Sequence, residues 1–171
     1  GKHTICIHEG EIFDEQFGGA ISPIYLSSSY PFIDQEEKRY PRYFNTPNQE
    51  VIAKKIAALE HAEAALPFAS GMAAISTTLL SFLKKGDHAV FQNEIYGGSF
   101  NLVVREFEDY GISYTFTEGI GIDDFEKAIR PNTKVIYIET PSNPLLSITD
   151  IQAVADLARS KGIVSVIDNT F

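Results

Sequence analysis

Cysteine is almost absent from this chain, since Cys6 is the only one in 171 residues. A single cysteine excludes an internal disulfide framework and is typical of a reducing compartment. No apolar run reaches the roughly 18 residues that a membrane span needs, and the N-terminus lacks the apolar core of a signal peptide. We therefore expect a cytoplasmic protein that has no membrane partner.

Positive charge is also scarce, because 14 Lys and Arg face 23 Asp and Glu, for a formal net charge of -9. Without a basic run or a stripe of basic and aromatic residues, nucleic acid is not expected as a partner. The sequence has no P-loop and no Gly-x-Ser-x-Gly elbow. His3, Cys6 and His8 lack a partner motif, so no metal site is expected.

Residues 1–45 differ from the rest of the chain. They contain Gly18-Gly19, three consecutive serines at 27–29 and several prolines, and they show little periodicity. This composition predicts an extended N-terminal arm, and arms of this kind often reach onto a neighbouring subunit.

Regular structure is expected from Thr46 onward, where Thr46-Pro47-Asn48-Gln49 forms a capping-box pattern with proline at the first helical position. The hydrophobic pattern then predicts strands at 64–68, 88–92, 113–117, 134–139 and 164–167. It predicts helices at 70–83, 98–110, 123–129 and 150–160, the last capped by Thr149.

This alternation predicts an α/β fold with a mostly parallel sheet and flanking helices. The last strand is apolar enough to be central. We therefore expect residues 46–171 to be the first part of a larger domain, so that the chain is truncated.

One candidate site lies at Ser70-Gly71-Met72, where a predicted strand ends and a helix of small residues begins. Free backbone amides and the helix dipole at such a point can bind an anion. The alternative is an ordinary serine N-cap with a glycine kept for packing. In the arm, Arg42 beside Tyr40 suits a phosphate, although a solvated surface charge explains it as well.

Three further candidates follow predicted strands. Tyr96 could stack on an aromatic cofactor and move a proton, or be a half-buried turn residue. Asn143 could donate to a phenolic oxygen, or belong to a rigid turn. Asp168 could pair with a protonated pyridine nitrogen, or cap a turn. Because the carboxyl ends of parallel strands share one edge of the sheet, these residues are expected to meet there. Pyridoxal 5'-phosphate (PLP) fits such a site, because it needs an anion site for its phosphate and a carboxylate for its ring nitrogen.

The motifs together resemble those of the Cys/Met-metabolism family of PLP-dependent enzymes, and the resemblance runs through residues 4–171. The segments that carry it are Pro23-Ile24-Tyr25, Tyr40-Pro41-Arg42-Tyr43, Ser70-Gly71-Met72-Ala73, Tyr96-Gly97-Gly98-Ser99, Glu139-Thr140-Pro141-Ser142-Asn143-Pro144 and Asp168-Asn169-Thr170. The resemblance implies the large domain of PLP fold-type I, which is aspartate-aminotransferase-like. It also implies a homodimer or homotetramer with shared active sites.

The same resemblance implies individual roles. The amides of Gly71 and Met72 would hold the cofactor phosphate, and Tyr40 and Arg42 would complete the phosphate site of the neighbouring subunit. The remaining cofactor-binding residues would be Ser70, Tyr96 on the ring face, Asn143 at the ring oxygen, Asp168 at the ring nitrogen, and Thr170. Tyr96 and Asp168 would also be catalytic. No lysine of this sequence matches the Schiff-base motif of the family, so the chain alone is not expected to turn over.

The implied activity is transsulfuration in sulfur amino-acid metabolism. We expect γ-replacement on an O-acylhomoserine with cysteine or sulfide, of the cystathionine γ-synthase or sulfhydrylase type, because Asn101 resembles the sulfhydrylase pattern at its position. A cystathionine γ- or β-lyase or a methionine γ-lyase is the alternative, although methionine γ-lyases usually carry cysteine in place of Gly98. An inactive fragment that serves as a binding or oligomerisation module is the alternative from another class.

Overall fold

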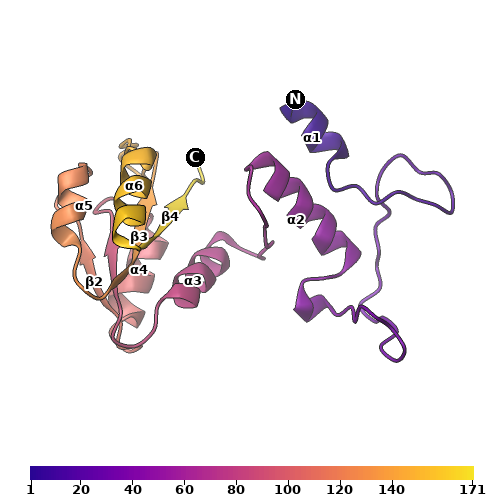
Figure 1. Ribbon diagram of the computed structural model, residues 1–171, viewed down its shortest axis with the longest axis horizontal. Coiled ribbons are helices and arrows are strands. Elements are labelled where there is room, and N and C mark those ends of the chain that lie inside the picture. The colour runs from indigo at the N-terminus through magenta and orange to yellow at the C-terminus, as the bar shows by residue number, and fades with distance from the viewer. The chain divides into compact units, whose positions relative to one another are not determined.

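The computed structural model describes all 171 residues as two compact units, Gly1–Phe68 and Ala69–Phe171. Figure 1 shows both units, each of which is described here by itself. No helix is long and apolar enough to cross a membrane.

The unit Gly1–Phe68 contains helix α1 (Lys2–His8), the short 3-10 helix η1 (Pro41–Tyr43) and helix α2 (Pro47–Leu59). The segment 9–40 has neither helix nor strand, as expected for an arm, whereas α1 was not expected. Two ion pairs tie this segment to α2. Lys55 Nζ lies 2.5 Å from Glu11 Oε1, and Arg39 Nη1 lies 2.6 Å from Glu50 Oε1.

Helix α2 begins where the capping box predicts. The Thr46 side chain and the Gln49 side chain cap each other's backbone, and Pro47 occupies the first helical position. The predicted strand at 64–68 is wrong, because these residues form no ladder with any neighbour. A short apolar run becomes a strand only where a partner strand satisfies its backbone groups.

The unit Ala69–Phe171 confirms the predicted α/β fold with a parallel sheet. Its strands are β1 (His88–Phe91), β2 (Ser113–Phe116), β3 (Thr133–Glu139) and β4 (Val164–Asp168), and its helices are α3 (Gly71–Phe82), α4 (Gly97–Glu106), α5 (Ile122–Ala128) and α6 (Ile151–Lys161). The strand order is β2-β1-β3-β4, and every pairing is parallel.

Helices cover both faces of this sheet, as the ribbon in Figure 1 shows. On one face, α3 and α4 contribute Leu79, Val103 and neighbouring residues, which pack on Phe91 and Tyr137. On the other face, Phe125 of α5 and residues of α6 pack on the alternate strand residues: Val90, Ile136 and Ile138. Because successive strand residues point to opposite faces, one apolar run in β3 fills both cores.

One expectation about the end of the chain stays a prediction, and one needs correction. Within this chain β4 pairs with β3 alone and lies at the edge of the sheet, and its expected central position concerns the larger domain. Its alternate residues Ser165 and Ile167 are accordingly exposed. The cap of α6 is Asp150 rather than Thr149: the Asp150 side chain accepts a 3.0 Å hydrogen bond from the Ala153 amide.

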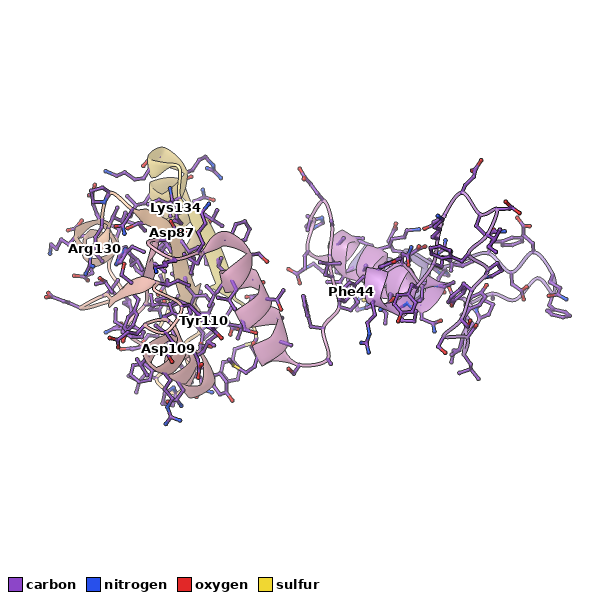
Figure 2. All side chains as sticks on the ribbon, turned by 90° about the horizontal axis from the view of Figure 1, so that it is seen from below. Phe44, Asp87, Asp109, Tyr110, Arg130 and Lys134 are labelled. Atoms are coloured by element: carbon purple, nitrogen blue, oxygen red, sulfur yellow. The ribbon has the colours of Figure 1, made fainter.

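The end of the sheet where the strands begin carries charged side chains. Asp87 precedes β1, Arg130 precedes β3 and Lys134 lies in β3, and all three are labelled in Figure 2. His88 at the start of β1 is fully buried. The opposite end of the sheet, where the strands stop, holds the candidate site.

Candidate functional site

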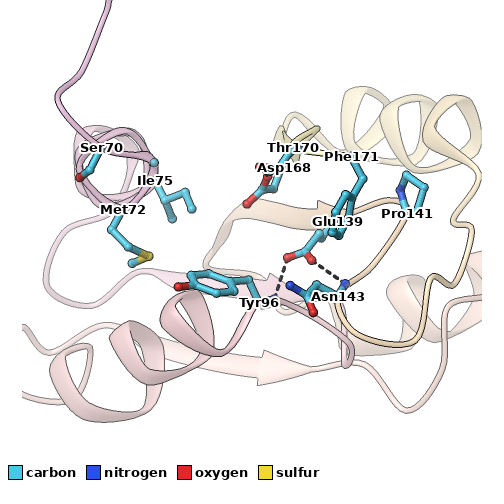
Figure 3. Close-up of a pocket in the computed structure, with 11 residues that line it drawn as sticks. Ser70, Met72, Ile75, Tyr96, Glu139, Pro141, Asn143, Asp168, Thr170 and Phe171 are labelled. Atoms are coloured by element: carbon cyan, nitrogen blue, oxygen red, sulfur yellow. Dashed lines mark hydrogen bonds between the residues drawn. The ribbon is translucent and has the colours of Figure 1, made fainter.

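A cavity of about 390 Å³ opens at the carboxyl edge of the sheet (Figure 3), within the size range of small-molecule sites. Its lining comes from the N-terminus of α3, the β1–α4 loop, the β3–α6 loop and the residues at and after the end of β4. The lining residues are Ser70, Gly71, Met72, Ile75, Tyr96, Glu139, Pro141, Asn143, Asp168, Thr170 and Phe171. The cavity therefore brings together seven of the nine predicted site residues.

The anion-binding candidate is the first turn of α3. The Ser70 side chain caps the helix by accepting a 3.1 Å hydrogen bond from the Ala73 amide. The amides of Gly71 and Met72 belong to the first turn, where helical N–H groups have no partner within the helix. A Cβ atom added to Gly71 would meet no atom within 4 Å, so a ligand has free access to the backbone there. This helix end can bind an anion.

The ring of Tyr96 forms a wall of the cavity, close to Met72 (Figure 3). Gly98 makes that position possible. A Cβ atom at residue 98 would lie 2.4 Å from Cε1 of Tyr96 and 2.9 Å from Sδ of Met72, closer than real contacts allow. The second glycine of Tyr96-Gly97-Gly98 therefore lets the ring fold back over the start of α4.

Glu139 fixes the two loops that carry Tyr96 and Asn143. It ends β3, is 4% exposed, and accepts 2.7 Å hydrogen bonds from the backbone amides of Tyr96 and Asn143 on its two carboxylate oxygens. Figure 3 shows both bonds as dashed lines. Hydrogen bonds to a charged group are among the stronger ones in proteins. A single buried carboxylate thus sets the distance between two walls of the cavity.

Gln92 also holds the loops around Glu139 in place. Its side chain is fully buried, donates 2.9 Å bonds to the carbonyls of Glu94 and Glu139, and accepts from the Thr149 hydroxyl at 2.9 Å. Thr149 is therefore occupied here instead of capping α6. The network is complete, and a fully paired buried network of this kind favours one loop arrangement.

Asp168 presents its carboxylate to the cavity from the end of β4. Its Oδ1 accepts from the Thr170 hydroxyl at 2.5 Å and from the Thr170 amide at 3.2 Å. Its Oδ2 accepts from the hydroxyl of Tyr137 at 3.0 Å. Thr170 thus lies where the sequence places it, and its contact in this structure is with Asp168.

Tyr40 and Arg42 belong to the other unit and do not line this cavity. Both are exposed, and Tyr40 packs edge-on against Tyr43 with ring centroids 5.4 Å apart. Arg42 forms no ion pair within the chain. Their predicted contact with a phosphate remains a prediction.

No group of three or more His, Cys, Asp or Glu side chains is placed to hold a metal ion. The cavity instead combines an aromatic wall, a helix N-terminus, an amide side chain and a carboxylate. No lysine or arginine lines it, so the amides of α3 are its main source of positive potential.

Comparison with known proteins assigns the chain to a family. The family described as Cys/Met metabolism PLP-dependent enzyme matches residues 3–171. The chain belongs to this family. It is similar to cystathionine gamma-lyase of Bacillus subtilis, with 42% identity over 99% of this chain and 45% of the relative.

A second relative from Bacillus subtilis is cystathionine gamma-synthase/O-acetylhomoserine (thiol)-lyase, 35% identical over 95% of this chain and 44% of the relative. Among solved structures, an O-acetylhomoserine (thiol)-lyase of Campylobacter jejuni aligns with a TM-score of 0.89 and 31% identity. That alignment covers 99% of this chain and 44% of the other. The chain thus spans less than half the length of these relatives.

These findings confirm PLP fold-type I and a PLP-dependent family. The Campylobacter jejuni structure contains N'-pyridoxyl-lysine-5'-monophosphate. The residues present here fit PLP: the amides of α3 suit its phosphate, the Tyr96 ring suits its face, and the Asp168 carboxylate suits its ring nitrogen. The side chain of Asn143 makes no hydrogen bond within the chain, so its amide is available to a ligand oxygen.

The sequence did not single out Glu139, Gln92 or Tyr137. A signal was present for the first two, since each is a polar residue directly after an apolar strand segment, at the edge where Asp168 was recognised. Glu139 even pairs with Asp168 in the register of β3 and β4. Tyr137 gave no such signal, because a tyrosine within an apolar strand is typical of a core.

Proposed function

We propose that the intact protein is a PLP-dependent transsulfuration enzyme that carries out γ-replacement on an O-acylhomoserine with cysteine or sulfide. The observation that carries the proposal is the single cavity that joins Tyr96, Asn143 and Asp168 to the N-terminus of α3. Membership in the PLP-dependent Cys/Met metabolism family supports it. Asn101 favours replacement over elimination, by its resemblance to the sulfhydrylases.

In this proposal each residue binds a different part of PLP. The amides of Gly71 and Met72, with Ser70 beside them, bind the phosphate. The Tyr96 ring covers one face of the cofactor and its hydroxyl moves a proton, while Asn143 donates to the phenolic oxygen. Asp168, held by Thr170, keeps the ring nitrogen protonated by charge pairing. When bound, PLP supplies an electron sink for the carbanion that forms at the substrate Cα.

A second copy of the chain is part of the proposal. Tyr40 and Arg42 are exposed, and Arg42 has no ion-pair partner within the chain. An unpaired guanidinium suits bidentate phosphate contact. We propose that these two residues complete the phosphate site of a neighbouring subunit in a homodimer or homotetramer, as the resemblance implies.

A lyase is the second candidate function, and the B. subtilis relative named cystathionine gamma-lyase favours it. The two candidates differ in their products. A replacement enzyme breaks the Cγ–O bond of the O-acylhomoserine, releases the acyl group as a carboxylate and joins Cγ to the sulfur of the acceptor. A lyase breaks a C–S bond of cystathionine and, with water, releases a thiol amino acid, a keto acid and ammonia.

The intact protein is assayed with PLP in two reactions: O-acetylhomoserine with cysteine or sulfide, and cystathionine alone. We expect cystathionine or homocysteine from the first reaction. Keto acid from the second reaction alone would support the lyase instead. Asp168→Asn is the matched variant, and it is expected to lower kcat by roughly 10²- to 10³-fold, because it removes the charge opposite the ring nitrogen.

Absence of turnover in both reactions by protein that binds PLP would contradict a transsulfuration enzyme. Unchanged turnover in Asp168→Asn would contradict the role given to that carboxylate.

A further inference from the structure

Tyr137 is a core residue with one polar contact at the site. It lies in the middle of β3, is 1% exposed, and its ring packs against Phe91 with centroids 5.6 Å apart. The hydroxyl donates a 3.0 Å hydrogen bond to Oδ2 of Asp168. A tyrosine whose ring lies in the apolar core therefore reaches, with its hydroxyl, the carboxylate that lines the cavity.

The strand register explains this contact. Tyr137 pairs with Val166 of β4, and Asp168 lies two residues farther along, on the same face of the sheet. Such diagonal neighbours on adjacent strands are within reach of a long aromatic side chain. The position of the hydroxyl is thus set by the sheet itself and not by a loop.

The two oxygens of Asp168 are held from opposite directions. Thr170, in the exposed segment after β4, bonds Oδ1, and Tyr137, in the core, bonds Oδ2. A carboxylate with a donor on each oxygen has its side-chain rotation restricted. Oδ1 already accepts two hydrogen bonds and Oδ2 only one, so Oδ2 keeps the capacity to accept one from a ligand.

Tyr137 also remains a donor. Burial raises the pKa of its hydroxyl well above the ordinary value; Ser99 lowers that pKa by less than burial raises it, and the carboxylates of Asp168 and Glu139 also raise it. The hydroxyl therefore keeps its proton at neutral pH and can donate it to Asp168. Loss of the hydroxyl would leave Oδ2 without its only partner from the chain.

We propose that Tyr137 is a positioning residue that orients the Asp168 carboxylate toward a cationic ring nitrogen, and so sets how tightly the site holds PLP. This inference rests on the proposed function, because it needs Asp168 to face that nitrogen. Tyr137 itself touches no cofactor. It acts only through Asp168, and this property makes the inference testable.

The experiment is a double-mutant cycle on the apparent dissociation constant of PLP in the intact protein, measured by absorbance titration. The variants are Tyr137→Phe, Asp168→Asn and the two combined. We expect Tyr137→Phe to weaken PLP binding roughly 3- to 10-fold, the net size of one typical hydrogen bond. Added to Asp168→Asn, the same change is expected to weaken binding less than 2-fold further, because the group through which it acts is gone.

Tyr114→Phe is the matched control. Tyr114 lies in β2 of the same sheet and packs against Phe107 and Phe116, and its hydroxyl makes no hydrogen bond within the chain. Removal of this hydroxyl is expected to leave PLP binding unchanged. Thermal unfolding of the apo proteins checks that each variant is folded.

Equal or tighter PLP binding by Tyr137→Phe overturns the inference, and so does a loss that is fully additive with that of Asp168→Asn. Both outcomes leave the proposed function intact. Failure of the wild-type protein to bind PLP would instead overturn the proposed function, and the inference with it.

Discussion

At the scale of single residues, the shape of the site depends on glycines as well as on the side chains that line it. Gly98 has no side chain, and the Tyr96 ring occupies the space that a Cβ atom would need. Gly97, one position earlier, has no atom within 4 Å of its hypothetical Cβ. Of these two adjacent glycines, only Gly98 leaves space that the Tyr96 ring occupies.

Gly98→Ala is therefore expected to displace the Tyr96 ring and to weaken PLP binding by about 10-fold, equivalent to ~1.4 kcal/mol. Gly97→Ala is the matched control, because both changes replace glycine by a better helix former near the N-terminus of α4. PLP titration of the two intact variants gives the comparison. Equal affinities for Gly97→Ala and Gly98→Ala would show that the ring position does not depend on Gly98.

The site residues that the sequence predicts are those whose residue type and place beside a strand or helix indicate a binding role. Asp168 and Asn143 follow strands and carry polar groups, and Ser70 precedes a helix. Glu139 was missed because a carboxylate directly after an apolar strand is equally typical of a solvated loop. Only the structure shows that two backbone amides approach it and that it is buried.

At the scale of elements, strand positions followed from apolar runs to within a residue or two. The wrong predictions concern residues whose structure depends on a partner elsewhere in the chain. Residues 64–68 have strand composition but no neighbouring strand. Thr149 was predicted to cap α6, but its hydroxyl donates to Gln92, and the Asp150 side chain caps the helix instead.

The amino end of β1 gives a prediction about pH. His88 is fully buried, with Nδ1 2.8 Å from Thr133 Oγ1 and Nε2 3.0 Å from Thr115 Oγ1. Burial, together with the smaller effect of the nearby Arg130, lowers the pKa of His88 from 6.5 to about 4. Between these two values the unfolded chain takes up a proton that the folded chain does not, so stability falls as pH falls through this window.

We expect this group to cost up to roughly 3 kcal/mol of unfolding free energy between pH 6.5 and 4, at about 1.4 kcal/mol per pH unit. Urea denaturation across this range measures it. His88→Gln is expected to be less stable at neutral pH and to have a shallower slope, whereas His61→Asn, at an exposed position, keeps the wild-type slope. An unchanged slope in His88→Gln would contradict the assignment.

At the scale of the whole molecule, the two units differ in how they are stabilised. The unit Ala69–Phe171 has apolar cores on both faces of its sheet, whereas the unit Gly1–Phe68 buries only Thr46 and exposes Phe13, Phe17 and Leu26. Large exposed apolar side chains in one segment are typical of an interaction surface. They support the proposal that the arm packs on a second copy of the chain.

The central claim is that one PLP molecule lies in the cavity at the carboxyl edge of the sheet, between the Tyr96 ring and the Asp168 carboxylate. A crystal structure of the intact protein with PLP tests it most directly. We predict the ring stacked on Tyr96, the ring nitrogen within hydrogen-bond distance of Asp168, and the phosphate at the N-terminus of α3 with Tyr40 and Arg42 of a second copy. PLP bound elsewhere, or with its ring nitrogen away from Asp168, would contradict the account.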